Sequence, residues 1–260
     1  MKVLLVGNGG REHAIACALV RTSTPEQPVS LVVQAGNPAL EQLGRSLTMD
    51  PLDPKDVVRR ATSEKVDLVV VGPEAPLVAG VADAVLDYGI PVFGPTKDAA
   101  RLEASKSFAK QIMADAGVAT ARSFTCTTME QVEAAFDVLG APYVVKDDAL
   151  AAGKGVVVTT DRAQASFHAR SCLSRDGGAV VIEDYLDGPE VSLFCFADGA
   201  TVVPLQPAQD FKRVGDGNEG PNTGGMGAYS PLPWLPEEAT QRIVDEVAQP
   251  VITEMARRGT

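Results

Sequence analysis

The first hundred residues alternate short apolar, β-branched runs with stretches of helical periodicity. The apolar runs lie at 2–7, 29–36, 66–72 and 90–95, and the helical patterns at 11–22, 54–65 and 75–89. The apolar runs have no internal polar alternation, which is typical of strands buried on both faces of a parallel sheet. We therefore predict an open parallel α/β sheet over residues 1–100, with ligands at the carboxyl ends of its strands.

The hydrophobic pattern changes after residue 100. The predicted elements are two short helices within 96–117, two strands around a small-residue loop in 143–158, a helix at 162–173, strands joined by turns from 179 to 211, a glycine-rich loop at 213–231 and an amphipathic helix at 236–259. Asp198-Gly199 is a candidate hairpin turn. Together these elements predict an α+β region after the parallel sheet.

Composition excludes several classes of function. Of the 260 residues 45% are hydrophobic and 22% charged, as in a soluble globular protein. The net charge of −11, with acids and bases interspersed, argues against nucleic-acid or membrane binding, which needs a basic face. The four cysteines form no C-x-x-C pair, so zinc is not expected. No secretory leader or bilayer-spanning apolar segment is recognised, and a cytoplasmic protein is expected.

The glycines and the lysine in the loop of 143–158 indicate phosphate binding, but not by a P-loop. That motif reads G-x-x-x-x-G-K-[ST] and opens a helix. Counted back from Gly153, Asp148 replaces the first glycine, and Gly155 stands where Ser or Thr is needed. The following "VVVTT" indicates a strand. We therefore expect the loop to join two antiparallel strands and to cover a phosphate as a hairpin.

The turn after the first strand, "VGNGGREHA", departs from the dinucleotide-binding fingerprint. Its spacing is Gly7-x-Gly9-x-x-Glu12, and the second strand ends at Gln34 rather than at an acid for a ribose hydroxyl. An NAD site is therefore disfavoured. The amides of residues 8–11 could still hold one phosphate, and a tight turn that binds nothing is an equally good interpretation.

Glu74 follows the third strand, at the sheet edge that also carries the Gly7 turn. It could contact the hydroxyls or the amine of a sugar-like substrate. Taken alone, it is better interpreted as a cap of the helix that starts near Pro76.

Three lysines are candidates for contact with an anion. Lys146 ends a buried-type strand, where a lysine without a partner is rare, so an anionic ligand is an economical explanation. Lys106 lies in a helical segment and Lys154 in the hairpin loop, and either could instead be solvated. His168 is expected on a helix surface, and no Ser-His-Asp or Cys-His arrangement is recognised.

The segment "VIEDYLDGPEVS" offers the groups that a nucleoside needs. A strand ends at Glu183, the apolar pair Tyr185 and Leu186 leads into a turn, and Glu190 begins another apolar strand. An adenine ring needs an apolar slot with a backbone donor and acceptor, and a ribose needs a carboxylate. An ordinary strand–turn–strand with solvated acids is the alternative.

These motifs together resemble one family. "LLVGNGGREHA", "GPEAPL", "VVKDDALAAGKGVVV", "EDYLDGPEVSL" and "PLQPAQDFKRVGDGNEGPNTGGMGAYSP" occur in the order found in phosphoribosylamine–glycine ligases, which are ATP-grasp enzymes of purine biosynthesis. The resemblance implies an α/β N-terminal domain with an open parallel sheet (a pre-ATP-grasp domain), followed by an α+β ATP-grasp region with a small lid subdomain. The implied reaction joins glycine to 5-phosphoribosylamine through glycyl phosphate, and converts ATP to ADP and phosphate.

The resemblance also implies a role for each domain and site residue. The domains would be a substrate-binding domain at 1–100, a helical connection at 101–122, the lid at 123–190 and the incomplete start of the central subdomain at 191–260. The ATP phosphates would be held by Lys106 and Lys146, under a lid loop containing Ala149, Gly153, Lys154 and Gly155. Adenine would contact Glu183, Tyr185 and Leu186, and the ribose Glu190. Phosphoribosylamine would lie near Gly9, Gly10, Glu74, Asp210 and Lys212, and glycine or its acyl phosphate near the amides of Asn222, Thr223, Gly224, Gly225 and Gly227.

Two features depart from the family pattern. Asp147 and Ala149 replace a small residue and a glycine, and a negative charge beside a phosphate site costs affinity unless its side chain turns away. Relatives also continue through a segment whose Glu and Asn bind magnesium, whereas this sequence stops at Thr260. We therefore expect a truncated chain without catalytic competence, with the Mg²⁺ or Mn²⁺ ligands in the missing segment and no metal ligand within the chain.

The implied partners are small molecules: ATP, glycine and 5-phosphoribosylamine, with no nucleic acid and no membrane, and the chain is expected to be a monomer. A non-catalytic nucleotide-binding protein or scaffold is one alternative. Another ATP-grasp ligase of purine metabolism is a second. An NAD-dependent enzyme is least favoured, given Glu12 and Gln34.

Overall fold

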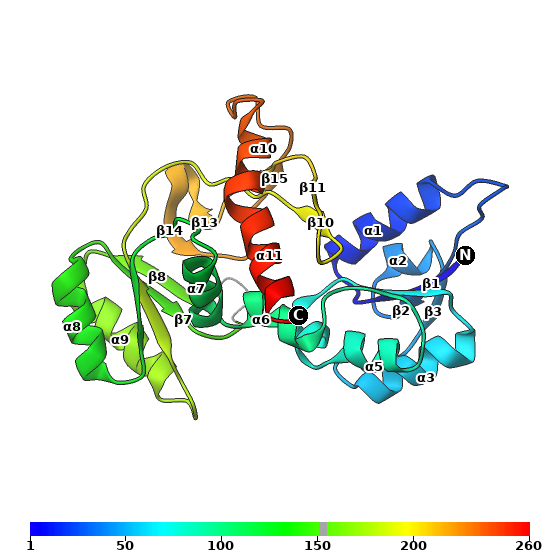
Figure 1. The fold of residues 1–260 in the computed structure, drawn as a ribbon, viewed down its shortest axis with the longest axis horizontal. Coiled ribbons are helices and arrows are strands. Elements are labelled where there is room, and N and C mark those ends of the chain that lie inside the picture. Colours follow the sequence, from blue (N-terminus) through cyan, green and yellow to red (C-terminus); the bar gives the residue numbers. More distant parts are fainter. Residues whose placement is uncertain (151–154) are drawn as a thin grey trace. The chain divides into compact units, whose positions relative to one another are not determined.

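The computed structural model describes residues 1–150 and 155–260, which form two compact units, Met1–Arg101 and Leu102–Thr260. Residues 1–101, all described, contain a five-stranded parallel sheet in the order β3-β2-β1-β4-β5 (Figure 1). Its strands are β1 (Lys2–Val6), β2 (Ser30–Gln34), β3 (Arg45–Leu47), β4 (Leu68–Val71) and β5 (Val92–Phe93). The connecting helices are α1 (Gly10–Arg21), α2 (Pro38–Glu41), α3 (Pro54–Glu64), α4 (Glu74–Val78) and α5 (Val81–Asp87). The predicted open parallel sheet is confirmed.

Helices cover both faces of this sheet. Val3 and Leu5 of β1 pack with Ala16 of α1 and Leu40 of α2. Leu4 and Val6 belong to the core of the opposite face, to which α3, α4 and α5 contribute, and Figure 1 shows the two helix layers on either side of the strands. Because successive side chains of a strand point to opposite faces, burial on both sides explains why β1 is apolar throughout.

Two features of this unit were not predicted. Residues 38–47 form α2 and β3, where no element was expected; the Asn37 side chain accepts hydrogen bonds from the amides of Ala39 and Leu40 and so starts α2. The single helix expected over 75–89 is two helices, because Gly80 has a φ of +92° and interrupts the helical backbone.

The second unit begins with helices α6 (Lys97–Ala104, which spans the boundary) and α7 (Lys106–Asp115), the two short helices predicted. An antiparallel sheet in the order β6-β9-β7-β8 follows, made of β6 (Ser123–Cys126), β7 (Tyr143–Asp147), β8 (Val156–Thr159) and β9 (Val180–Glu183). Helices α8 (Met129–Leu139) and α9 (Arg162–Leu173) pack against this sheet. The antiparallel pairing of β7 with β8 confirms that the small-residue loop belongs to a hairpin; Gly153 and Lys154 lie outside the described residues.

The two faces of this sheet have different neighbours. Val145 of β7 and Ile182 of β9 pack with Phe136 of α8 and with α9. Strand alternation sends Lys146 and Glu183 to the other face, where Glu183 meets Lys110 of α7. The apolar core therefore lies on one side of the sheet and a charged cluster on the other.

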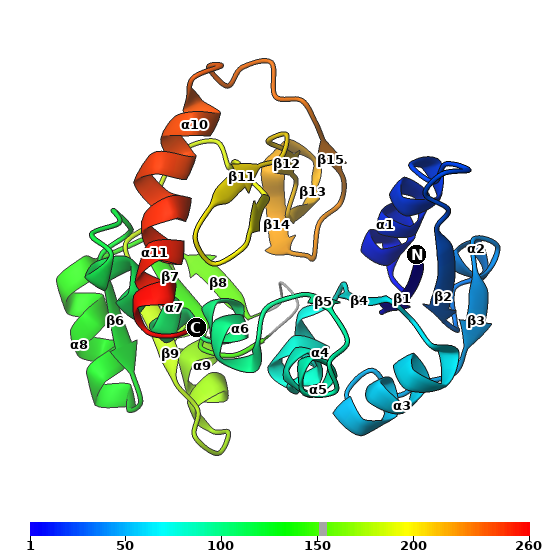
Figure 2. The same cartoon turned by 45° about the vertical axis from the view of Figure 1, so that its right-hand side comes forward.

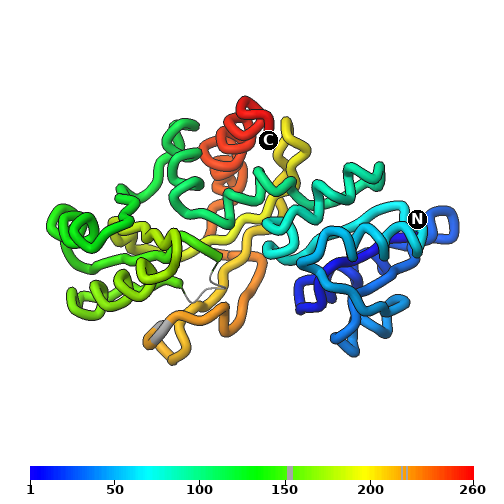
Figure 3. The backbone as a smooth tube through the Cα atoms, turned by 90° about the horizontal axis from the view of Figure 1, so that it is seen from below, coloured from blue at the N-terminus to red at the C-terminus, as the bar shows by residue number. Residues whose placement is uncertain are grey.

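Short strands continue the second unit; Figure 3 traces most of this part of the backbone in yellow to orange. They are β10 (Cys195–Ala197), β11 (Val202–Pro204), β12 (Gln209–Asp210), β13 (Arg213–Gly215), β14 (Glu219–Asn222) and β15 (Ala228–Tyr229), paired as β10-β11, β12-β15 and β13-β14, with a 3₁₀ turn at Asp216–Asn218. The Asp198-Gly199 hairpin is confirmed, because β10 and β11 are antiparallel around it. Two expectations are corrected: the strand expected at Glu190 begins only at Cys195, and the expected loop at 213–231 contains β13, β14 and β15.

The predicted C-terminal amphipathic helix is present as α10 (Ala239–Ile243), a π-helical turn (Val244–Ala248) and α11 (Gln249–Arg257). Figure 2 shows α11 beside α7, against which it packs. Arg258 forms an ion pair with Asp115 at the end of α7 and another with Glu254. None of the helices in the described ranges has the length and apolar character required to span a membrane.

Replacing Glu254 with glutamine should weaken the acid dependence of unfolding. Hydrogen bonds from Arg257 and Arg258 lower the pKa of Glu254 from 4.5 to about 2. A lowered folded-state pKa gives stability that is present above pH 4.5 and is lost as the pH falls toward 2. Urea unfolding at pH 7 and pH 3, followed by the fluorescence of the single tryptophan, Trp234, measures it.

Glu246→Gln is the matched control, because Glu246 is an exposed glutamate of the same helical segment. It should unfold with the pH dependence of the unmodified chain. An identical loss of stability between pH 7 and pH 3 in Glu254→Gln and in the unmodified chain would contradict this role for Glu254.

Candidate functional site

Lys146 and Glu183 are diagonal neighbours across the β7–β9 pair. Lys146 lies opposite Val181, and the two charged side chains form an ion pair on one face of the sheet. The Nζ atom of Lys110, from α7, lies 2.8 Å from Glu183 Oε2. The Glu183 side chain is only 7% exposed, whereas that of Lys146 is 31% exposed. Two ammonium groups around one carboxylate leave a net positive charge on this face.

The lysines determine the ionisation of Glu183. Burial alone would raise its pKa, but the adjacent ammonium groups of Lys110 and Lys146 outweigh burial and lower the pKa. Glu183 is therefore a carboxylate at neutral pH, with one ammonium group against each oxygen. This arrangement holds Lys146 in place, and the adenine contact expected for Glu183 stays a prediction.

Lys106 reaches the first leg of the hairpin. Its Nζ atom donates to the backbone oxygen of Ala149 at 3.0 Å, so Lys106 is bonded and half-buried instead of solvated. Asp148 accepts hydrogen bonds from the first turn of α7, including one of 2.9 Å from the Ser107 amide. The structure therefore brings Lys106, Ala149 and Lys146 into one region of the second unit.

Asp147, the charge that departs from the family pattern, turns away from Lys146. Strand alternation places it on the helix-covered face, where it is buried and forms an ion pair with Arg175, which follows α9. Its charge is therefore compensated on the side of the sheet opposite to the lysines.

The second leg of the hairpin begins at Gly155, which is buried. Its backbone oxygen accepts from the amide of Asp147 at 2.8 Å and lies 3.3 Å from Nε2 of His168. The same ring nitrogen lies 3.7 Å from the Sγ atom of Cys172, whose pKa is raised by burial and by Asp147. His168 is thus half-buried beside the hairpin and is not the free surface residue that the sequence suggested.

The segment after β9 leaves polar backbone groups available. Tyr185 and Leu186 are 47% and 70% exposed. Their amide and carbonyl groups make no hydrogen bond to other residues within 1–150 and 155–260, whereas the preceding amide of Asp184 is bonded to Arg122. The backbone donor and acceptor expected for a base are therefore open.

Glu190, Asp210 and Lys212 form one cluster. The Lys212 Nζ atom lies 3.2 Å from a Glu190 oxygen and pairs with Asp210. Partial burial alone would lower the pKa of Lys212, but its hydrogen bonds to Asp210 and Glu190 outweigh burial and raise it. The structure thus brings together Glu190, which the sequence analysis places at the ribose of ATP, and Asp210 and Lys212, which it places near phosphoribosylamine.

The loop amides expected to face an anion are partly occupied. The Thr223 amide donates to Lys212 O at 2.6 Å and that of Met226 to Phe211 O at 2.7 Å. The Gly225 amide donates to the Thr223 hydroxyl at 3.1 Å. The Gly224 amide makes no such bond to the described residues, and an anion contact at this loop stays a prediction.

In the first unit, the turns after β1 and β4 meet at one sheet edge, as predicted. Arg11 Nη1 donates to a Glu74 oxygen at 2.7 Å and to the Gly72 backbone oxygen at 2.8 Å. Partial burial would raise the pKa of Glu74, but the hydrogen bond from Arg11 contributes to a net lowering. Glu74 starts α4, so it lies where a helix cap is expected and also faces the turn that carries Gly9 and Gly10.

Glu12 and Gln34 are the two departures from the dinucleotide fingerprint. Their side chains accept hydrogen bonds from backbone amides of this turn. Glu12 is 4% exposed and accepts from the Gly9 amide at 2.6 Å. Gln34 Oε1 accepts from the Gly7 amide at 2.9 Å. Two amides that a dinucleotide loop would direct at phosphate are thus bonded within the protein.

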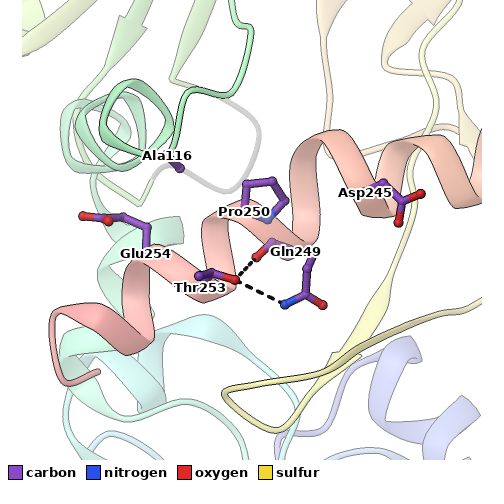
Figure 4. Close-up of a pocket in the computed structure, with 6 residues that line it drawn as sticks. All are labelled: Ala116, Asp245, Gln249, Pro250, Thr253 and Glu254. Atoms are coloured by element: carbon purple, nitrogen blue, oxygen red, sulfur yellow. Dashed lines mark hydrogen bonds between the residues drawn. The ribbon is translucent and has the colours of Figure 1, made fainter.

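Two surface hollows lie elsewhere and contain no predicted site residue. One, of about 300 Å³, is lined by Ala116, Asp245, Gln249, Pro250, Thr253 and Glu254 (Figure 4). The other, of about 570 Å³, is lined by Lys55, Val58, Arg59, Thr62, Ser63, Ala84 and Tyr88. Within the described ranges, no group of three or more His, Cys, Asp or Glu side chains could hold a metal ion.

Comparison with known families accounts for the whole chain. Residues 1–103 match the model of the phosphoribosylglycinamide synthetase N domain, and residues 104–260 match that of the phosphoribosylglycinamide synthetase ATP-grasp (A) domain. The chain belongs to the phosphoribosylglycinamide synthetase family. Its fold is therefore the open parallel sheet of that family's N domain followed by an ATP-grasp region.

Similar proteins agree with this family. A phosphoribosylamine–glycine ligase of Streptomyces coelicolor is 56% identical over 260 residues, which are 100% of this chain and 61% of the relative. The ligase of Mycobacterium leprae is 53% identical, with 100% and 62% covered. This chain thus spans about 61% of the length of the curated relatives that it matches.

Solved structures show the same fold. The phosphoribosylamine–glycine ligase of Thermotoga maritima has a TM-score of 0.81 at 28% identity, and the match covers 100% of this chain and 62% of that one. The biotin carboxylase domain of Hydrogenobacter thermophilus 2-oxoglutarate carboxylase, determined with MgADP, ADP and bicarbonate, has a TM-score of 0.75 at 18% identity, with 97% and 58% covered.

Proposed function

We propose that this chain carries nucleotide-binding and substrate-binding parts of an ATP-dependent ligase that joins glycine to 5-phosphoribosylamine. Family membership over residues 1–260 supports the proposal. The observation that carries it is the positive cluster of Lys146, Lys110 and Glu183, with Lys106 beside the hairpin that follows β7. A polyphosphate needs such clustered ammonium groups, because each lysine offers three donors and a compact charge.

The proposed reaction has two steps. A carboxylate oxygen of glycine attacks the γ-phosphorus of ATP, which forms glycyl phosphate and releases ADP. The amine of phosphoribosylamine then attacks the acyl carbon, loses a proton, and displaces inorganic phosphate to give glycinamide ribonucleotide. The protein contributes positioning and charge neutralisation, with no covalent nucleophile.

Several predicted site residues have a proposed part in this scheme. Lys106 and Lys146 bind phosphate oxygens, the open backbone groups of Tyr185 and Leu186 bind adenine, and Glu190 binds the ribose. Glu183 holds Lys146. In the first unit, Gly9, Gly10 and Glu74 bind phosphoribosylamine. For Asp210 and Lys212, the contact with phosphoribosylamine stays a prediction from the sequence.

Among the described residues, no group of three or more His, Cys, Asp or Glu side chains could hold a metal ion. We propose that Mg²⁺ or Mn²⁺ ligands come from polypeptide outside these 260 residues. A monomeric state and a cytoplasmic location also stay predictions from the sequence.

An ADP-release assay tests the proposed function. The chain is incubated with MgATP, glycine and phosphoribosylamine, and each substrate is omitted in turn. ADP formation that needs both glycine and phosphoribosylamine supports the ligase. ADP release indifferent to glycine would contradict it. If MgATP binds without any ADP formation, calorimetry with phosphoribosylamine decides, because a part of the ligase binds this substrate and a non-catalytic nucleotide-binding protein does not.

A further inference from the structure

Asp148 connects the hairpin to the start of α7. Its Oδ1 atom accepts from the Ser107 amide at 2.9 Å and from the Ser105 hydroxyl at 3.2 Å, and its Oδ2 atom accepts from the Ser107 hydroxyl. Ser105 is itself the N-cap of α7, because its hydroxyl accepts from the Phe108 amide at 3.1 Å. A carboxylate at a helix N-terminus is also favoured by the helix dipole. Asp148, which lies 41 positions from Ser107 in the sequence, therefore adds a second cap to the one that Ser105 provides.

The backbone of Asp148 is fixed to the sheet. Its amide donates to the Ala179 backbone oxygen at 3.0 Å, next to the start of β9. Lys146 lies two residues earlier, in β7. Its partner Glu183 also pairs with Lys110 of α7, the helix whose first turn binds the Asp148 carboxylate, so both groups contact the same helix.

Lys106 lies between the two serines that Asp148 binds. Its Nζ atom donates to Ala149 O, the residue after Asp148, at 3.0 Å. One of its three donors is used in this way, so the same ammonium group can bind a phosphate oxygen while it holds the hairpin leg. Lys106 and Lys146 are consequently connected through residues 148 and 149.

We propose that Asp148 is a positioning residue that fixes Lys106 relative to Lys146 and so sets the spacing of two ammonium groups for neighbouring phosphate oxygens. The proposal rests on the nucleotide site proposed above, but it concerns a residue that need not touch the nucleotide.

The first test is free of nucleotide. In Asp148→Ala, hydrogen exchange of the amides at 105–109 should become faster by about tenfold, because the first turn of α7 loses its acceptor. Asp148→Asn keeps an oxygen for the Ser107 amide and should stay close to the unmodified chain. Asp161→Ala is the matched control: Asp161 caps α9 through the Ala163 amide at 2.8 Å, and its loss should affect exchange at 162–166 only.

The second test uses MgATP as the probe in titration calorimetry. Asp148→Ala should bind about tenfold more weakly, which corresponds to 1.4 kcal/mol. Asp148→Asn should recover most of the affinity. Asp161→Ala should bind as the unmodified chain does even where its thermal stability falls, which separates positioning from a general loss of a helix cap.

The outcomes distinguish this inference from the proposed function. Unchanged exchange at 105–109 in Asp148→Ala would overturn it, as would faster exchange with unchanged MgATP affinity. An unmodified chain that does not bind MgATP would overturn the proposed nucleotide site, and the spacing role with it. Equal weakening in Asp148→Ala and Asp161→Ala would also overturn the inference.

Discussion

Replacing Lys146 with methionine should weaken MgATP binding by this chain roughly 100-fold, equivalent to about 2.7 kcal/mol. The ammonium group is partly exposed, at 31%, on the face shared with Lys110 and Glu183, where it can reach a phosphate. Methionine keeps the length and apolar body of the side chain but removes its charge. Stability should fall by about 2 kcal/mol, because Glu183 then keeps only Lys110 as an ionic partner.

A second substitution separates the two effects. Glu183→Gln added to Lys146→Met removes the buried charge that lost its partner, so unfolding followed by Trp234 fluorescence should show stability partly restored. MgATP affinity should stay low, because the missing ammonium group is not replaced. Recovery of affinity together with stability would show that Lys146 acts through folding alone, and normal affinity in Lys146→Met would remove Lys146 from the nucleotide site.

The parallel sheet was predictable because the burial of each strand can be recognised from that strand's own sequence. Each of its longer strands is buried on both faces, and such strands appear as uninterrupted apolar runs. The short α2 and β3 were missed because the Arg45–Leu47 strand has two exposed residues and α2 has only four residues. In such segments a cap from Asn37 and pairing to β2 decide the structure, and neither leaves a periodic pattern.

The strands after Glu190 were harder to place for a related reason. Strands β10 to β15 are two to four residues long and pair two by two. Several apolar side chains there are exposed, among them Phe196 at 48% and Val203 at 54%. Inward and outward positions therefore do not alternate clearly, and glycine-rich "RVGDGNEGPN" looks like a loop although its ends pair as β13 and β14.

The candidate site was predictable as a set of residues but not as a set of contacts. Lys146 could be identified because a charge at the end of a buried strand needs a partner, but the sequence pattern does not show that Glu183 is that partner. Lys110 was missed, although "KSFAK" places it four residues after Lys106 on the same helical face. Asp148 was noticed only as a departure from the P-loop, because its partners lie on a distant helix.

Gly72 has no room for a side chain. Gly72→Ala should lower the free energy of unfolding of the first unit by about 3 kcal/mol. A methyl group there would lie 2.6 Å from Cγ of Glu12 and would also overlap its carboxylate. Glu12 is buried and bonded to the Gly9 amide, so it cannot move without releasing the turn after β1. The urea dependence of hydrogen exchange in peptides from residues 2–21 measures the effect in this unit.

A double-mutant cycle identifies Glu12 as the cause. In a Glu12→Ala background, Gly72→Ala should cost much less than it does alone, because the side chain that it overlaps has been shortened. Gly10→Ala is the matched control: a methyl group at Gly10 meets no atom within 4 Å, so stability should hardly change. Equal costs for Gly72→Ala in both backgrounds would show that Glu12 does not impose glycine at this position, and that another contact of the β4 turn does.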